Sequence, residues 1–287
     1  MTGATRIAGF AAGVVAVAGA AAAVGLAVGP IDRGHDTNAG HGGAGHTAAA
    51  MDDHGAPPGL AVTQDGLSLV PALRTAVAGT ATQYAFRIVG EDGETVRDFD
   101  VEHDRPMHMI VVRRDLTGFQ HLHPRMDADG TWRTPFTPDA PGTYRVFADF
   151  SHEGRSTTLG VDLGVPGQSG HEALPAPAEV ASAGPYTVRL QGSAVQRGAA
   201  SDLAFQVSRD GERVQDLQPY LGARGHLVAL REGDLAFLHV HPLDDATPGP
   251  SVRFRVEWSG AGRYRLFLQV RHDGRIVTTP FTVEVRA

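Results

Sequence analysis

The sequence predicts an all-β protein in which two tandem β-sandwich domains, immunoglobulin-like or cupredoxin-like, follow an N-terminal transmembrane helix. Three observations lead to this prediction. A long pattern of residues occurs twice, each copy consists of short alternating segments between turn residues, and one apolar run lies close to the N-terminus. The first observation fixes the number of domains, the second their class, and the third their attachment.

The repeat defines two domains and the linker between them. Two pairs of segments match at a spacing of 118 residues and a third pair at 120, so two extra residues fall in one loop. The pairs are GEDGETVRDF (90–99) with SRDGERVQDL (208–217), MHMIVVRRDLTGFQHLHP (107–124) with GHLVALREGDLAFLHVHP (225–242), and PGTYRVFADFSHEGR (141–155) with AGRYRLFLQVRHDGR (261–275). A twofold repeat of this period indicates tandem domains. We place them at 60–165 and 185–287, joined by a Pro/Ala/Gly-rich linker at 166–184.

Each copy has the pattern of a β domain. Segments such as YAFRIV, YRVFADF and YRLFLQV alternate apolar and polar residues between Gly, Pro and Asp turns. No segment sustains the 3.6-residue apolar period of a helix. About 100 residues with roughly seven such strands are typical of an immunoglobulin-like sandwich, and a closed barrel is the main alternative. The motifs PGTY and AGRY place Tyr144 and Tyr264 where these domains form a tyrosine corner.

The N-terminus predicts that both domains lie outside the cytoplasm. Residues 7–29 are apolar or small and uncharged, and a helix of this length spans a bilayer. Arg6 is the only charged side chain before them, which places residues 1–6 in the cytoplasm. A cleavable signal peptide is the alternative, although the apolar run exceeds the usual signal-peptide core and no clear cleavage motif precedes Pro30.

Residues 30–59 are predicted to form a disordered, His-rich tether. Large apolar residues are almost absent, so the segment cannot bury a core. Its histidines are His35, His41, His46 and His54. They belong either to a solvated spacer or to a loose collector of Cu(II), Zn(II) or Ni(II), since imidazole binds all three ions.

Composition excludes several classes of function. The net charge of −7 creates no general attraction to nucleic acid or to anionic membrane surfaces. The absence of Cys excludes disulfides, thiolate nucleophiles and Cys-ligated metal sites, including blue-copper electron transfer. No P-loop, dinucleotide-binding glycine motif or Ser-His-Asp elbow occurs in the sequence, and we expect no enzyme.

The candidate site residues of the first copy lie in one predicted hairpin. The motif His-x-His-Pro supplies His121 and His123, and His108 lies on the preceding strand. A two-residue turn at Arg114-Asp115 would place His108 opposite His121, with His123 as the diagonal neighbour on the same face. Three imidazoles would then converge, and such a set leaves an open coordination position on a metal ion.

The second copy predicts the same arrangement. Its His-x-His-Pro motif supplies His239 and His241, and His226 occupies the position of the preceding-strand histidine. A two-residue turn at Glu232-Gly233 would place His226 opposite His239, with His241 diagonal. The sequence therefore predicts one His cluster in each copy.

Four further residues complete the predicted metal ligands. His152 and His272 occupy matched positions at the next hairpin turn, and the sequence leaves open whether they approach the clusters. Met107 and Met109 flank His108 with thioether donors, which favour Cu(I). Neighbours at i±1 face the other side of a strand, so apolar filling is the alternative for both methionines. Copper is the expected ion and zinc the alternative.

The same histidines also have a structural interpretation. The face that they share is apolar and can bury neutral imidazoles that bond to backbone groups. Its apolar residues are Ile110, Val112 and Phe119 in the first copy and Val228, Leu230 and Phe237 in the second. We favour metal binding because two or three histidines at one end of a sheet exceed what packing usually needs.

The repeated segments resemble those of actinobacterial secreted or membrane-anchored proteins with tandem domains of the "GHLVALR…LHVHP" type. That resemblance implies a location outside the cytoplasm and an association with heavy metals. The β-sandwich class and the His and Met content are also loosely similar to extracytoplasmic copper-handling sandwiches of the CopC and YtkA-like kind.

Three functions follow as hypotheses. The first is a membrane-tethered extracytoplasmic protein that buffers copper or passes it to an envelope or transporter partner. The second is an extracytoplasmic interaction or adhesion module with structural histidines and no metal. The third is a metal hydrolase with Asp127 or Asp245 as general base, although an Asp in a polar loop is usually a solvated turn residue. Because clustered imidazoles titrate near pH 6–7, a His metal site is expected to empty between about pH 7.5 and 5.5.

Overall fold

The structure is a computed structural model that describes residues 57–192, 198, 200–238, 240–244 and 249–287. The predicted transmembrane helix, most of the tether, His239 and Asp245 lie outside the described residues. The described residues are all-β, as predicted, and among them no helix is long and apolar enough to cross a membrane. Both copies fall in the same compact unit of the chain.

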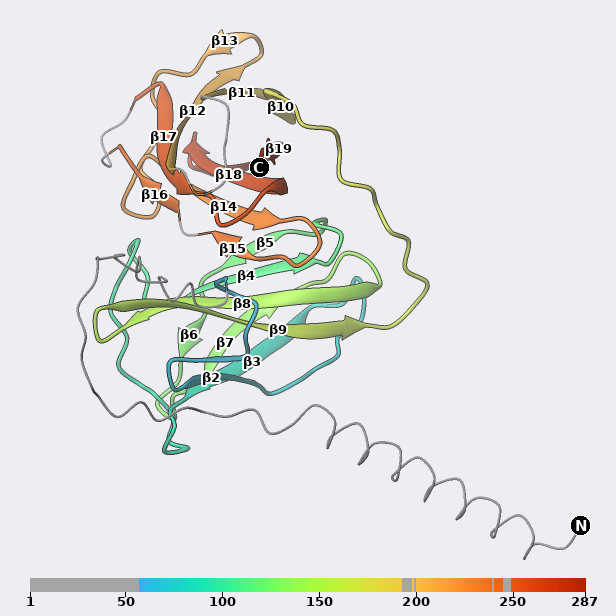
Figure 1. Cartoon of the computed structure of the whole chain (residues 1–287), viewed down its shortest axis with the longest axis vertical. Helices are drawn as coiled ribbons and strands as arrows, with labels where there is room; N and C mark the ends of the chain where they lie inside the picture. Colours follow the sequence, from blue (N-terminus) through green and yellow to red (C-terminus); the bar gives the residue numbers. More distant parts are fainter. Residues whose placement is uncertain (1–56, 193–197, 199, 239, 245–248) are drawn as a thin grey trace, which may run out of the picture. The chain divides into compact units, whose positions relative to one another are not determined.

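The first copy is built from two antiparallel sheets (Figure 1). One sheet has the strand order β1-β2-β3-β7-β6, and the other has the order β5-β4-β8-β9. The strands of the first sheet are β1 (Thr63–Gln64), β2 (Leu67–Pro71), β3 (Thr82–Val89), β7 (Trp132–Phe136) and β6 (Arg125–Met126). Those of the second are β5 (Gln120–Leu122), β4 (His108–Arg113), β8 (Gly142–His152) and β9 (Arg155–Val165). Two separate sheets make a sandwich and not the closed barrel.

The second copy repeats this plan. Its larger sheet has the order β10-β11-β12-β17-β16, with β13 beside β12, and its smaller sheet has the order β15-β14-β18-β19. The larger sheet contains β10 (Val180–Ala183), β11 (Tyr186–Gly192), β12 (Ala200–Arg209), β13 (Glu212–Arg213), β16 (Val240–Pro242) and β17 (Ser251–Glu257). The smaller contains β14 (Gly225–Arg231), β15 (Phe237–Leu238), β18 (Gly262–His272) and β19 (Arg275–Val285). The tandem sandwiches predicted from the repeat are therefore present.

Each sandwich encloses its own apolar core. Phe86 of β3 and Val146 of β8 share one core in the first copy, so both of its sheets contribute. Phe205 of β12 and Leu266 of β18 share the core of the second copy in the same way. These residues lie on the inner faces because side chains alternate between the two faces of a strand.

Both tyrosine corners are confirmed. The hydroxyl of Tyr144 donates to the carbonyl of Ala140 at 2.9 Å, and the hydroxyl of Tyr264 donates to the carbonyl of Gly260 at 2.9 Å. Both tyrosines are fully buried. Each hydroxyl satisfies its hydrogen-bonding capacity inside the core and ties the start of a long strand to the preceding loop.

A third apolar core joins the two copies. Every residue of β4 is buried, because Met109 and Val111 face the core of the first sandwich while Ile110 and Val112 face the other way. Val228 and Leu230 of β14 share this outer core with Ile110 and Val112. The apolar face that the sequence showed in each copy is thus the surface by which the two copies pack together.

Aromatic rings reinforce the contact between the copies. Phe119 stacks on Phe267 with ring centroids 4.0 Å apart, and Phe147 lies 5.5 Å from Phe237. Full burial of one phenylalanine contributes about 1.5–3 kcal/mol. Several such rings therefore hold the smaller sheets of the two sandwiches against each other.

Candidate metal centre

Strand alternation positions the histidines of the first copy. His108 begins β4 and shares the outward face of Ile110 and Val112, so it faces the second copy. His121 lies in β5 directly opposite Ile110, and residues opposite each other in an antiparallel pair share a face. His123 follows one residue after the end of β5. All three histidines are therefore placed at one end of the surface between the copies.

The predicted hairpin register is wrong by two residues. His121 pairs with Ile110 and not with His108, and in the second copy Ala229 pairs with Leu238. The turn is longer than two residues because the Asp115 carboxylate accepts bonds from both the backbone and the hydroxyl of Thr117. A register shift of two residues keeps every side chain on its original face, so the three histidines still lie on one face.

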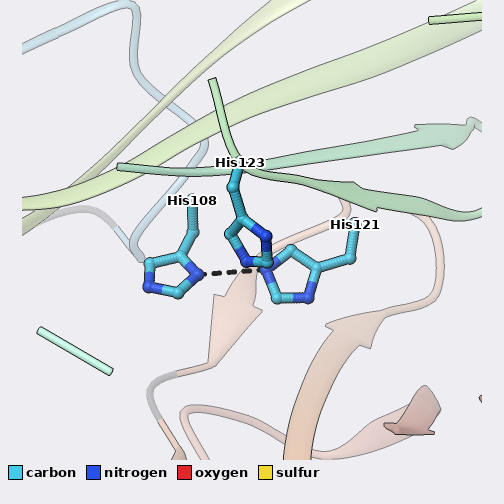
Figure 2. Close-up of side chains that lie close together, drawn as sticks. All are labelled: His108, His121 and His123. Carbon is cyan, nitrogen blue, oxygen red and sulfur yellow. Dashed lines mark hydrogen bonds between the residues drawn. The ribbon is translucent and has the colours of Figure 1, made fainter. Parts of the chain in front are cut away.

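The three imidazoles of the first copy converge (Figure 2). One ring nitrogen each of His108, His121 and His123 lies within 4.8 Å of the other two. His108 Nδ1 and His121 Nε2 are 3.0 Å apart. Metal–nitrogen distances of about 2.0–2.1 Å require donor atoms at separations of this order. We call these three residues the His triad.

The outer nitrogens of the triad are held by hydrogen bonds. His108 Nε2 lies 3.1 Å from the backbone carbonyl of Glu102, which can only accept, so this nitrogen carries the proton. His121 Nδ1 lies 2.6 Å from Gln269 Oε1, and the amide nitrogen of Gln269 donates to Thr278 Oγ1 at 3.1 Å. With the amide in this orientation, His121 Nδ1 is also protonated.

These bonds leave two lone pairs facing each other. A neutral imidazole carries one ring proton, so His108 Nδ1 and His121 Nε2 are both unprotonated across their 3.0 Å contact. His123 Nε2 is buried and has no hydrogen-bond partner among the described residues. The contact between His108 and His121 therefore holds two unprotonated nitrogens, and either a proton or a metal cation must occupy the gap between them.

Burial disfavours the proton. It lowers the pKa of His121 well below the usual histidine value, and the rings of His108 and His123 lower it further. Burial also lowers the pKa of His108, although the carboxylate of Asp149 opposes this shift. Burial and the neighbouring His108 lower the pKa of His123 to about 4. The rings are therefore neutral near pH 7, which is the form that binds metals.

The second copy contributes to the same cluster. The ring of His226 stacks on His121 at 4.7 Å and on His108 at 5.7 Å. Gln269, on β18 of the second copy, orients His121 as described above. His226 thus adds a fourth imidazole to the triad of the first copy, where the sequence predicted a separate cluster in each copy.

A second, separate triad is not seen in the described residues. They contain a single group of three potential ligands, the His triad. In the second copy β15 pairs with β14, whereas β16, which carries His241, pairs with β17 of the other sheet. His241 is exposed and lines the same cavity as His226. His241 therefore lies in the larger sheet, whereas its counterpart His123 lies between β5 and β6 in the first copy.

Four predicted ligands lie away from the cluster. Met107 and Met109 are fully buried in the core of the first sandwich. They therefore fill the apolar core, which was the alternative to metal ligation. His152 donates from Nδ1 to the carbonyl of Asp98 at 2.8 Å. His272 is buried beside Tyr186, with 2.9 Å between its Nδ1 and the tyrosine hydroxyl. None of the four joins the triad, and we leave them out of the proposed site.

A cavity of about 260 Å³ adjoins the cluster and is lined by both copies. His103, His108, His226 and His241 line it, together with acidic residues that include Asp149. No sequence pattern pointed to His103, because it lies in a loop and its counterpart at the repeat spacing is a leucine. Its ring lies 5.8 Å from that of His226. The cavity supplies space for an exchanging ligand next to the triad.

Asp127, the candidate general base within the described residues, lies away from the cavity beside the triad. It forms an ion pair with Arg133 at 2.6 Å and is exposed. Asp127 is thus the solvated loop residue that its sequence context favoured.

The metal-free protein is expected to lose stability as the pH falls from about 6.5 to about 4. The unfolded chain takes up protons at the usual histidine pKa of 6.5, whereas folded His123 resists protonation until about 4. The unfolded state therefore binds more protons than the folded state throughout this range, and the free energy of unfolding decreases as the pH is lowered. Urea unfolding at several pH values measures the slope. The variant His123→Gln should have a flatter slope, and equal slopes would contradict the buried, neutral state.

The comparisons with known proteins identify the family. The model of the Domain of unknown function family DUF8832 matches residues 62–167 and again 179–287. The chain belongs to this family. The double match also confirms the twofold repeat, and it defines each sandwich as one DUF8832 domain. No curated protein matches the chain in sequence.

Solved structures similar to the chain include bacterial adhesins. The Escherichia coli adhesin FdeC is 13% identical, with 79% of this chain and 66% of that chain covered and a TM-score of 0.26. The Yersinia pseudotuberculosis adhesin InvE is 14% identical, covering 76% and 58%, with a TM-score of 0.24. Salmonella alpha-2-macroglobulin is 14% identical, covering 80% and 15%, with a TM-score of 0.28. The chain spans less than two thirds of each of these proteins, and likenesses at this level carry no argument about function.

Proposed function

We propose that this DUF8832 protein is a non-enzymatic, extracytoplasmic metal-binding protein with one ion site at the His triad. The observation that carries the proposal is the pair of facing lone pairs on His108 and His121, with the unpartnered His123 Nε2 beside them. Metal-ligating histidines usually donate their other ring N–H to a carbonyl or similar acceptor, as His108 and His121 do here. The triad thus has both the ring nitrogens that would bind an ion and the hydrogen bonds that would orient those rings.

The ligand chemistry favours a divalent transition metal. The proposed site contains only imidazole donors, because Met107 and Met109 face the sandwich core and the chain has no Cys. Imidazole suits Cu(II), Zn(II) and Ni(II), and among these Cu(II) binds most tightly to a given nitrogen site. Cu(II) is therefore our first choice and Zn(II) the alternative. Without a thioether on the site, nothing favours Cu(I).

An exchangeable ion fits the site better than a purely structural one. Three imidazoles leave a coordination position open, and the adjoining cavity of about 260 Å³ places free space and further histidines next to it. In the proposed role the protein buffers the ion or passes it to an envelope or transporter partner. The N-terminal segment would hold it at the membrane, and the histidines of the tether would collect ions.

Metal binding is expected to raise the thermal stability of residues 57–287, a fragment that excludes the tether. An ion that binds only the folded state adds about 2.7 kcal/mol at a free concentration one hundred times its Kd. Differential scanning calorimetry with Cu(II) or Zn(II) measures the shift in Tm. A chelator should reverse the shift, and the triple variant His108→Ala, His121→Ala, His123→Ala should not show it.

An envelope interaction module is the second candidate. The observation in its favour is that His121 and His226 pack ring on ring at 4.7 Å, as structural histidines do. It predicts an unchanged Tm with either metal and a loss of stability in the triple variant. That combination of results would replace the metal-binding proposal.

A further inference from the structure

A second cavity of about 510 Å³ lies in the first copy and shares one lining residue, Arg105, with the cavity of about 260 Å³ beside the cluster. Three arginines line it, Arg97, Arg105 and Arg125, and the indole of Trp132 forms part of its wall. The volume is within the range of about 300–1,000 Å³ that is typical of small-molecule sites. His123 is the only member of the His triad that lines it.

The three guanidinium groups are free to bind an anion. None of them forms an ion pair with another described residue, and the one hydrogen bond in this group runs from Arg105 Nη1 to the backbone carbonyl of Asp104. The nearby loop carboxylates have other partners, since Asp127 pairs with Arg133 and Asp129 with Arg87. No acidic side chain lines the cavity. Guanidinium groups bind carboxylates through two parallel hydrogen bonds.

The wall also offers a buried donor and apolar surface. Trp132 is 2% exposed, and its Nε1 has no hydrogen-bond partner among the described residues. An indole N–H can only donate, so an acceptor on a ligand would satisfy it. Phe99 meets Trp132 edge to face at 5.2 Å, and Pro106, Pro124 and Met126 complete the apolar lining.

The second copy provides an internal comparison. At the repeat spacing of 118 residues, the counterparts of the three arginines are Gln215, Ala223 and Leu243. The second sandwich folds with the same strand plan, so the arginines are not required by the architecture. Their grouping around one cavity is specific to the first copy.

We propose that this cavity binds an organic anion with two carboxylates on an apolar or aromatic frame. The carboxylates would pair with Arg97, Arg105 and Arg125, and the frame would lie against Phe99 and the prolines. The indole N–H of Trp132 would donate to one carboxylate oxygen. The site does not depend on the metal-binding proposal, because its charged residues are outside the His triad.

The test is an NMR titration of the ¹⁵N-labelled full chain with isophthalate, in the presence of a chelator that keeps the protein metal-free. The chain has two tryptophans, so two indole N–H signals report on the two copies, and a Trp258→Phe variant assigns them. The Trp132 signal should shift and saturate while the Trp258 signal stays in place. Isophthalamide, which has the same frame without the charge, should shift neither signal.

Variants complete the test. The substitutions Arg97→Gln, Arg105→Gln and Arg125→Gln should each weaken isophthalate binding by about tenfold or more, since each removes a charged hydrogen-bonding group. Arg213→Gln, at an exposed position of the second copy, is the matched control and should bind normally. Without isophthalate, a Trp132 signal at its usual position shows that the first sandwich of each variant is folded. Binding that persists when Arg97, Arg105 and Arg125 are all replaced by Gln, or equal shifts of both indoles, would overturn the proposal.

Discussion

Replacing His121 with alanine is expected to lower the affinity for Cu(II) by about a hundredfold or more. Loss of a group that merely supports a metal ligand typically lowers affinity by about 10–100-fold, and His121 is a proposed ligand itself. It also connects the site to the second copy through Gln269. Competition with a chromophoric chelator, on residues 57–287, measures the change.

His152→Ala is the matched control for this substitution. His152 belongs to the duplicated set of histidines, but its Nδ1 binds the carbonyl of Asp98 and it lies away from the triad. The affinity for Cu(II) should be unchanged in this variant. Equal losses in the two variants would indicate nonspecific surface binding and would contradict the assignment of the ligands.

The second large effect is expected from Phe267→Ala, which removes no ligand. Phe267 stacks on Phe119 in the core between the copies and lies two residues from Gln269 on β18. A Phe→Ala change in a core destabilises it by about 3–5 kcal/mol. The contact between the copies should loosen, so the affinity for Cu(II) should fall although the His triad is intact. Small-angle scattering should show a larger radius of gyration.

Phe281→Ala separates this effect from general destabilisation. Phe281 is 1% exposed and lies in the internal core of the second sandwich. The global stability should fall by a similar amount, while the affinity for Cu(II) of the folded protein should stay close to that of the unchanged chain. A normal affinity in Phe267→Ala would show that the site does not need the second copy.

Much of the fold could be predicted from local sequence. Alternation, Asp-Gly turns and the repeat spacing indicated two sandwiches, and PGTY and AGRY indicated the corners at Tyr144 and Tyr264. The apolar face containing Ile110 and Val228 was also visible as a pattern. The sequence did not show what covers that face, because the pairing of two surfaces far apart in the chain leaves no local periodicity.

The candidate site was predictable only in part. His108, His121 and His123 could be assigned to one face, because an error of two residues in register preserves the face. The loop length itself depends on side-chain bonds of Asp115, which a turn motif does not reveal. Gln269 is 148 positions from His121, and its role depends on packing between the copies.

The structure also revises the expected pH dependence of metal binding. On isolated imidazoles, protons would compete with the metal ion for the ring nitrogens near pH 6–7. Burial lowers the pKa of His123 to about 4 and that of His121 well below the usual value, so proton competition begins at lower pH. Release of the ion is therefore expected below about pH 5 and not between 7.5 and 5.5.

The number of Cu(II) ions bound by residues 57–287 tests the central claim most directly. The copies share one cluster in the described part of the chain, so equilibrium dialysis followed by metal analysis should give one ion per chain. The variant without His108, His121 and His123 should give none. Two ions per chain would mean that each repeat binds independently, and no bound ion would make the cluster structural.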